Sequence, residues 1–187
     1  MAVIGKDFKY KLIENFLSKD EIDLFYEYAK IRHLGNTNEF GILELDKILT
    51  CDTSIYADPF FEALLKYKTK HLENETGLRL LPTYSYWRLY THGAELTKHS
   101  DRDACEISVT VNIFGKEDWP IFMNNNPVII KPGDACVYLG QEVDHYRKVF
   151  TGHHQVQVFL HYVNADGDKK EQHLDKRSNQ SKRIQGV

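Results

Sequence analysis

The chain has 187 residues, 24 basic and 27 acidic side chains, a net charge of −3 and 42% hydrophobic residues, which suits one soluble globular domain. No apolar run approaches the roughly 20 residues of a membrane helix, and the first residues contain no apolar stretch of signal-peptide length. The three cysteines (Cys51, Cys105 and Cys136) are widely spaced, which argues against a disulfide framework and a CxxC zinc site. We therefore expect a cytoplasmic protein with no membrane partner, whose oligomeric state the sequence does not indicate.

Two helices are predicted in the first part of the chain, over about residues 18–34 and 58–76. Ser18 and Glu21 form a capping-box sequence, and apolar residues follow at helical spacing. The second helix begins with Asp58 as N-cap and a proline at the first helical position. The face that we expect it to bury consists of Phe61, Leu64, Leu65, Lys68 and Leu72.

Short strands are predicted over about residues 83–163. The pattern is clearest in 106–114, where Ile and Val alternate with Ser, Thr and Asn. Seven short strands with turn residues between them favour a sandwich or double-sheet jelly roll over a parallel fold, with the two helices packed outside one sheet. The predicted strands are 83–90, 106–114, 119–123, 127–131, 135–139, 145–150 and 155–163.

The last residues, 167–187, differ from the rest in charge. They hold six basic and three acidic residues, a charge of +3, which leaves −6 on residues 1–166. With one Leu, one Ile and one Val, this segment has too little apolar surface to bury. We therefore predict a single folded domain over 1–166 and a charged, disordered tail.

Two His-x-Asp sequences are present among the nine histidines. His173 and Asp175 lie in the charged tail with no strand after them, and we interpret that pair as accidental. His99 and Asp101 precede a predicted strand, and residues two apart on an extended segment point to the same side. His145 begins a later strand and could supply a third ligand. Two imidazoles and one carboxylate leave three positions open on a metal, as in non-haem Fe(II) oxygenases.

The residues around these candidates carry a family resemblance. Residues 84–93 (Tyr-Ser-Tyr-Trp-Arg-Leu-Tyr-Thr-His-Gly), 99–102 (His-Ser-Asp-Arg) and 131–134 (Lys-Pro-Gly-Asp), with His145 eleven residues after that last Asp, form the pattern. It resembles the Fe(II)/2-oxoglutarate-dependent dioxygenases of the prolyl-4-hydroxylase-like branch. The resemblance covers roughly residues 10–165.

The resemblance implies a mainly β fold with flanking helices, a double-stranded β-helix of jelly-roll or cupin-like form. It implies iron held by His99, Asp101 and His145, with no catalytic residue beyond these ligands. It also implies that 2-oxoglutarate is decarboxylated to succinate and CO2 while dioxygen is used to hydroxylate a C–H bond. Ascorbate is an additional cofactor that the resemblance allows. The expected substrate is a peptide, with prolyl residues as one candidate, or a small molecule.

One position departs from the family. Relatives carry Lys or Arg about ten residues after the second His, where it pairs with the far carboxylate of 2-oxoglutarate, but here that residue is Gln155. A buried carboxylate needs a cation or several donors, and a guanidinium suits it. We predict Arg147 or Arg88 as this anchor, with Tyr90, Thr110 and Gln155 as further donors. The alternative is that both arginines form ordinary ion pairs.

The remaining candidates are weaker. We expect Tyr86 and Arg102 to contact the substrate. His153 and His154 are neighbours on an extended segment and point oppositely, so both cannot readily bind one metal ion. Asp103 is close enough in sequence to replace Asp101 as the carboxylate ligand, but only Asp101 has the His-x-Asp spacing.

Other classes of function stay open at this stage. A cupin-like protein could bind iron, manganese or zinc without 2-oxoglutarate, and the Gln at position 155 favours it. A binding module without activity is a further alternative, which the intact triad disfavours. Nucleic-acid demethylation occurs on the same fold but needs a basic groove, whereas residues 1–166 carry −6.

Overall fold

The computed structural model describes residues 9–36 and 52–177, which form ten strands and two α-helices. In chain order the elements are β1 (Tyr10–Ile13), α1 (Lys19–Asn36), β2 (Thr53–Tyr56), α2 (Pro59–Thr76), β3 (Leu80–Thr91), β4 (Leu96–His99), β5 (Ile107–Gly115), β6 (Ile121–Met123), β7 (Asn126–Val128), β8 (Ala135–Leu139), β9 (His145–Arg147) and β10 (His154–Asn164). Neither of the described helices combines the length and apolar character that crossing a membrane requires.

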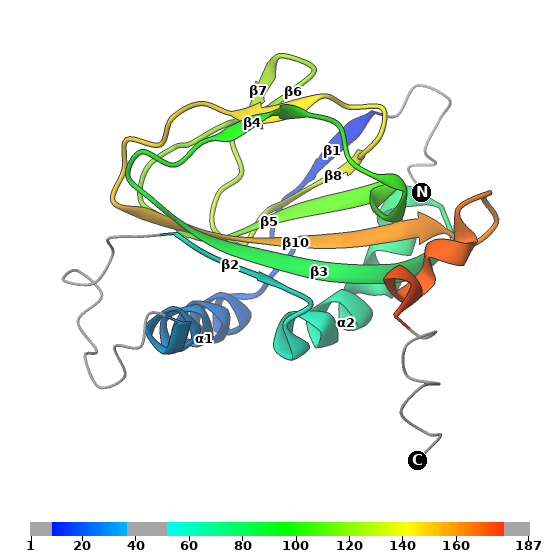
Figure 1. Cartoon of the computed structure of the whole chain (residues 1–187), viewed down its shortest axis with the longest axis horizontal. Coiled ribbons are helices and arrows are strands. Elements are labelled where there is room, and N and C mark those ends of the chain that lie inside the picture. Colours follow the sequence, from blue (N-terminus) through cyan, green and yellow to red (C-terminus); the bar gives the residue numbers. More distant parts are fainter. Residues whose placement is uncertain (1–8, 37–51, 178–187) are drawn as a thin grey trace.

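The strands form two antiparallel sheets that face each other (Figure 1). The larger sheet has the order β1-β8-β5-β10-β3-β2, and the smaller has the order β4-β9-β6-β7. Both helices lie on the outer face of the larger sheet, opposite the smaller one. This is a double-stranded β-helix with helices packed outside, as the sequence predicts.

The helix termini form where the sequence predicts them. The Ser18 N–H donates to Glu21 Oε2 at 2.7 Å, and the Glu21 N–H donates to Ser18 Oγ at 3.2 Å, so the capping box begins α1. The Asp58 side chain accepts from the first turn of α2, and Gly77 ends that helix in a left-handed conformation with φ of 72°. The residues predicted to form the buried face of α2 are all buried.

The main core lies between the helices and the larger sheet. Phe25 and Phe61 from the helices pack with Trp87 of β3 and with the Val and Ile side chains of β5 and β10. Burying each such side chain contributes about 1.5–3 kcal/mol. Ser108 and Thr110 occupy the other face of β5, and their hydroxyls hydrogen-bond inside the barrel. The inner face of β5 therefore carries polar side chains, whereas its outer face joins the apolar core.

Three short strands, β1, β2 and β4, are absent from the prediction, and each lies at the edge of its sheet. The predicted strand ends also shift by a few residues; 145–150, for example, shortens to β9. Asn124 and Asn125 form the turn between β6 and β7, where they take positive φ values of 49° and 67°.

The prediction of a disordered tail is wrong for its first part. The chain after β10 makes 3₁₀ turns within Lys170–Lys176 and packs beside β3. Polar contacts hold it there: Asp175 binds Arg102 and Tyr56, and Arg177 binds Glu62. Because these contacts need no apolar surface, hydropathy does not reveal them. Residues 178–187 of the predicted tail lie outside the described residues.

Candidate active site

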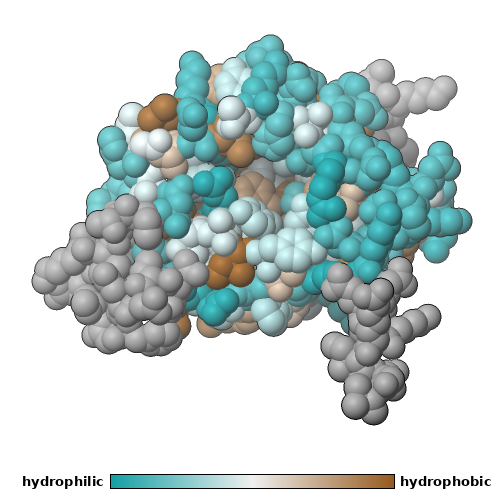
Figure 2. All heavy atoms as spheres, viewed as in Figure 1, coloured by the Kyte–Doolittle hydropathy of each residue, from teal (hydrophilic) through white to brown (hydrophobic). Residues whose placement is uncertain are grey.

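A cavity of about 350 Å³ opens between the two sheets. Figure 2 shows this face of the molecule hollowed in that region. Aromatic side chains of β2, β3 and β10 form much of its wall: Tyr56, Tyr84, Tyr86, Tyr90 and Phe159. His99, Asp101 and His145 line the same cavity, so the three predicted metal ligands share it with a largely aromatic surface.

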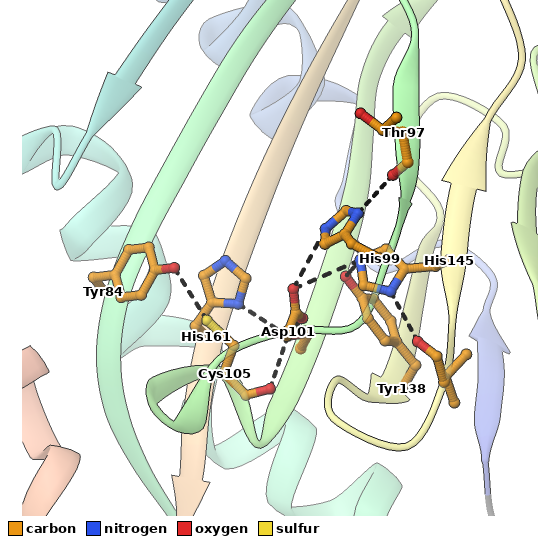
Figure 3. A network of polar contacts seen from close by, with 10 residues as sticks. Tyr84, Thr97, His99, Asp101, Cys105, Tyr138, His145 and His161 are labelled. Atoms are coloured by element: carbon orange, nitrogen blue, oxygen red, sulfur yellow. Dashed lines mark hydrogen bonds and ion pairs between the residues drawn. The ribbon is translucent and has the colours of Figure 1, made fainter.

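The pairing of β4 with β9 brings these three residues together (Figure 3). His99 ends β4 directly opposite His145, which begins β9, and their ring centroids lie 4.3 Å apart. Asp101 follows in the loop, and its Oδ1 lies 3.8 Å from His99 Nε2 and 3.6 Å from His145 Nε2. One ligand atom from each residue lies within 4.8 Å of the other two. The donor set therefore converges on one point.

The orientation of each ligand is set by a second contact. His99 Nδ1 lies 2.7 Å from the Thr97 carbonyl, and His145 Nδ1 lies 2.9 Å from the Val143 carbonyl. A carbonyl only accepts, so each Nδ1 carries the hydrogen and each Nε2 keeps a lone pair for a metal. Burial also lowers the pKa of His145, which keeps its ring neutral. Two neutral imidazoles and a carboxylate fit a non-haem Fe(II) ion.

Asp101 is held from both sides. Its backbone N–H donates to the Gly140 carbonyl at 2.8 Å, and its Oδ2 accepts from Ser108 Oγ at 2.6 Å. Only glycine fits at position 140, because a Cβ there would lie 2.5 Å from Asp101 Oδ2 and 2.1 Å from the Cys105 carbonyl oxygen. The close packing leaves Oδ1 as the oxygen that faces the two imidazoles.

Arg147, one of the two predicted anchors, is buried and is not among the residues that line the cavity. It lies two residues after His145 on β9 and is 2% exposed. Its guanidinium stacks on Trp119 at 4.8 Å and donates from Nη1 to the Trp119 carbonyl. Nε and Nη2 have no hydrogen-bond partner among the described residues. Burial lowers its pKa to about 10, so the group still carries a positive charge at neutral pH.

Arg88 has a different environment. It lines the cavity on β3, but its Nη2 donates to Asp52 Oδ2 at 3.0 Å, and its guanidinium lies 4.2 Å from the centre of the Tyr90 ring. Its charge is thus already balanced by a carboxylate, whereas Arg147 has no carboxylate partner within residues 9–36 and 52–177. The sequence gives no reason to prefer one of these arginines as the carboxylate anchor, but the ion pair with Asp52 distinguishes them.

The predicted auxiliary donors are divided between the cavity wall and the deeper barrel. Tyr90 lines the cavity. Thr110 donates to Gln157 Oε1 at 3.2 Å, and Gln155 is buried with its Oε1 unpaired among the described residues. Sequence reasoning missed Gln157, although its spacing of two residues from Gln155 on β10 is the signal that could have found it.

Other residues at the cavity were not predicted. Tyr138 of β8 lines it, and its hydroxyl lies 3.5 Å from His145 Nε2. His161 of β10 also lines it and binds Ser108 at 3.0 Å, and burial lowers its pKa to about 4. The sequence carries no signal for His161, because its place depends on which residue of β5 it faces.

His153 and His154 lie elsewhere, beside a separate hollow of about 310 Å³. Within the described ranges, only two groups of three His, Cys, Asp or Glu residues bring ligand atoms within 4.8 Å of one another, and neither group includes these histidines. The first group is the triad above. The second is Asp101, Cys105 and His161.

The predicted substrate contacts Tyr86 and Arg102 both line the cavity. Arg102 is held from outside by residues 170–177, which we call the C-terminal strap. It donates to both oxygens of Asp175, at 2.8 and 2.9 Å, while Tyr56 donates to the same carboxylate at 2.5 Å. Asp175 and both its neighbours take left-handed conformations, with φ from 51° to 59°, which cost energy for residues other than glycine. The polar contacts therefore hold the strap against its own backbone strain.

Replacing Asp175 with Asn is expected to loosen the strap. The bond from Arg102 lowers the pKa of Asp175, so the contact is complete at neutral pH and is lost only as pH falls through that lowered value. Losing an ion pair worth about 1 kcal/mol should raise the rate of tryptic cleavage in residues 169–177 roughly fivefold at pH 7. Asp168→Asn, an exposed change two residues before the strap, is the control. Equal cleavage of the two variants would show that the contact does not hold the strap.

Comparison with known proteins locates the fold. No protein-family model matches the sequence, and the search of curated proteins finds no match. Solved structures do match: the viral collagen prolyl hydroxylase of Paramecium bursaria Chlorella virus-1, in a 2OG complex, has 15% identity and a TM-score of 0.62 over 83% of this chain and 96% of its own. A prolyl-4-hydroxylase of Pseudomonas putida has 16% identity and a TM-score of 0.58 over 84% and 94%.

A third structure is similar to the same extent. The epimerase SnoN, in complex with Fe3+, alpha ketoglutarate and nogalamycin RO, has 13% identity and a TM-score of 0.64 over 84% of this chain and 80% of its own. At these identities the comparisons establish the fold. The resemblance read from the sequence is confirmed at that level, because these proteins include prolyl hydroxylases and share this jelly-roll architecture.

Proposed function

We propose that the chain is an Fe(II)- and 2-oxoglutarate-dependent oxygenase that hydroxylates a C–H bond and releases succinate and CO2. The observation that carries this proposal is the convergence of His99, Asp101 and His145 in one cavity, with both imidazoles oriented by backbone carbonyls. The fold supports it, since the neighbours named above include proteins described with 2OG or with iron.

In this proposal His99 Nε2, Asp101 Oδ1 and His145 Nε2 hold the iron. Iron supplies the oxidising chemistry when bound, with open positions for 2-oxoglutarate and dioxygen. The protein's own contribution is to hold these three donor atoms close together and in a fixed orientation. Ser108 contributes by occupying Asp101 Oδ2.

Arg147 is the proposed partner of the far carboxylate of 2-oxoglutarate. A buried cation without a counter-charge is costly, and an anionic ligand that enters beside it removes that cost. Its unpaired Nε and Nη2 are adjacent guanidinium nitrogens, which can bind a carboxylate through two parallel bonds. A cation on β9 would also account for Gln155, since a second buried cation on β10 would then be unfavourable. We propose that Arg88 is part of the cavity wall and that Tyr90 is an auxiliary hydrogen-bond donor to 2-oxoglutarate.

The proposed substrate is a peptide, with prolyl residues as one candidate, or a small molecule. Tyr86, close to Phe159 in the aromatic wall, is the substrate contact that the geometry favours. Arg102 is less suited to bind substrate directly, because Asp175 already occupies its guanidinium.

The alternative is a cupin-like metal protein that does not use 2-oxoglutarate, which the Gln at position 155 favours. An anaerobic titration of 2-oxoglutarate into the Fe(II)-loaded protein separates the two. We expect a saturable visible charge-transfer band of an iron-bound 2-oxo acid, absent in His99→Ala. Tight Fe(II) binding without a band would support the alternative instead.

A further inference from the structure

Beside the proposed iron site lies a second cluster of polar groups, drawn in Figure 3. Asp101, Cys105 and His161 have the spacing of a metal site. The Ser108 hydroxyl, however, already bonds to two of them, at 2.6 Å from Asp101 Oδ2 and 3.0 Å from His161 Nδ1. The Tyr84 hydroxyl lies 3.0 Å from the sulfur of the third, Cys105. The cluster is therefore a hydrogen-bonded network in which each of the three groups already has a partner.

The positions of the hydrogens in this network follow from a count. Ser108 Oγ has one hydrogen, and its neighbours are the Asp101 carboxylate, the Cys105 carbonyl at 3.2 Å, His161 Nδ1 and the Tyr138 hydroxyl. The first two neighbours only accept, and the bond to Asp101 is the shortest, so the serine hydrogen points there. His161 Nδ1 must then donate to Ser108. In a neutral ring with a hydrogen on Nδ1, Nε2 has a lone pair and no hydrogen.

This lone pair faces the cavity. His161 lines it, and within the described residues its Nε2 makes no hydrogen bond. Figure 3 shows that ring nitrogen pointing away from the Asp101 side of the ring, into the space between Tyr84 and His99. A carboxylate of 2-oxoglutarate has no hydrogen to offer such an atom, so the cosubstrate is not its partner. The group that fits it is an N–H or O–H donor.

We propose that His161 Nε2 is a fixed hydrogen-bond acceptor for the substrate, so that the cavity selects compounds with an N–H or O–H donor close to the carbon that is oxidised. This inference rests on the proposed function, because the ligand that enters the cavity is a substrate only if the protein is an oxygenase. Amide-bearing peptides and hydroxylated or amine-bearing rings belong to the selected class, and fully alkylated analogues do not.

The tautomer of His161 can be observed directly. Long-range ¹H–¹⁵N spectra of histidine-labelled protein, loaded with diamagnetic Zn(II) and 2-oxoglutarate, distinguish a protonated from an unprotonated ring nitrogen. We expect Nδ1 protonated and Nε2 unprotonated in the wild type, and loss of this preference in Ser108→Ala. A wild-type ring protonated at Nε2, alone or together with Nδ1, would overturn the proposal before any substrate analogue is added.

Two pairs of small rings then test recognition. 2-Pyrrolidinone and N-methyl-2-pyrrolidinone differ by one N–H, and phenol and anisole differ by one O–H. In each pair we expect the donor to shift the His161 Nε2 resonance and to bind roughly fivefold tighter than its methylated partner, as a net hydrogen bond of about 1 kcal/mol predicts. His161→Phe, with His161→Leu as a second variant that also lacks an acceptor, should bind both members equally. Wild-type protein that does not prefer the donors, or whose Nε2 resonance does not move, contradicts the proposal.

The anaerobic charge-transfer titration, run on Fe(II)-loaded wild-type and variant protein, separates the two hypotheses. A normal band in His161→Phe together with lost donor preference is the expected result, since the proposed cosubstrate site does not include this residue. A wild-type protein without the band but with the donor preference would leave His161 as a binding residue and refute the oxygenase assignment. A wild-type protein with the band but without the donor preference would support the oxygenase assignment and refute the role of His161 as a hydrogen-bond acceptor.

Discussion

Replacing Arg147 with Met is expected to abolish useful binding of 2-oxoglutarate while making the ligand-free protein more stable. The guanidinium is 2% exposed, and its Nε and Nη2 have no partner among the described residues. Breaking a buried charge pair costs about 3–5 kcal/mol, so the Kd for 2-oxoglutarate should rise by roughly two to three and a half orders of magnitude. In the absence of ligand the same change removes an unbalanced buried charge, and we expect a gain of about 1–4 kcal/mol in unfolding free energy.

The opposite signs make this prediction specific. A residue that merely supports the fold would lose stability and affinity together. Calorimetric titration of 2-oxoglutarate into the Mn(II)-loaded protein gives the Kd, and denaturant unfolding of the metal-free protein gives the stability. Arg88→Met is the matched control: Arg88 is balanced by Asp52 at the cavity wall, so we expect a change of less than tenfold in Kd. Unchanged affinity in Arg147→Met would refute the anchor assignment.

The parts of the site that sequence predicted are those carried by local pattern. His99 and Asp101 are two residues apart, and His145 and Arg147 share one face of a short strand for the same reason. Because Gln155 stands where relatives carry Lys or Arg, the sequence also indicates that the cation for the far carboxylate lies at another position. What the pattern does not contain is which arginine is paired with a carboxylate, because Asp52 lies 36 residues before Arg88 and meets it only in the folded chain.

The contacts that were missed depend on strand register or on polar packing. His161 faces Ser108 because β10 pairs with β5 in one particular register, with a shift at Val156 and Gln157 that no sequence pattern indicates. The strap was missed for another reason. Asp175 and Arg177 hold it through ion pairs, and a hydropathy pattern reports only apolar burial. The same limit applies to the short edge strands, where the alternation is too brief to recognise.

Replacing Asp101 with Asn is expected to cost the protein its metal, whereas the same change at Asp103 is expected to leave metal binding intact. Both residues lie in the loop after His99, and both changes replace a carboxylate by an amide of the same shape. Asp101 Oδ1 lies within 3.8 Å of both imidazole Nε2 atoms, while the Asp103 side chain is 64% exposed and bonds to Gln141. Only the first change removes an anionic ligand from the converging donors.

The expected loss of affinity in Asp101→Asn exceeds about 100-fold, the upper range seen when outer-shell partners of a metal are removed. Co(II) is a suitable probe, because its visible bands report the ligand geometry in the absence of turnover. Unfolding adds an independent measurement: metal at 100 times its Kd should stabilise the wild type and Asp103→Asn by about 2.7 kcal/mol and Asp101→Asn by less than about 0.5 kcal/mol. If Asp103→Asn lost this stabilisation and Asp101→Asn kept it, the carboxylate ligand would have to be reassigned. The proposed role of Ser108 would then be lost as well, because that hydroxyl can orient the metal site only through Asp101.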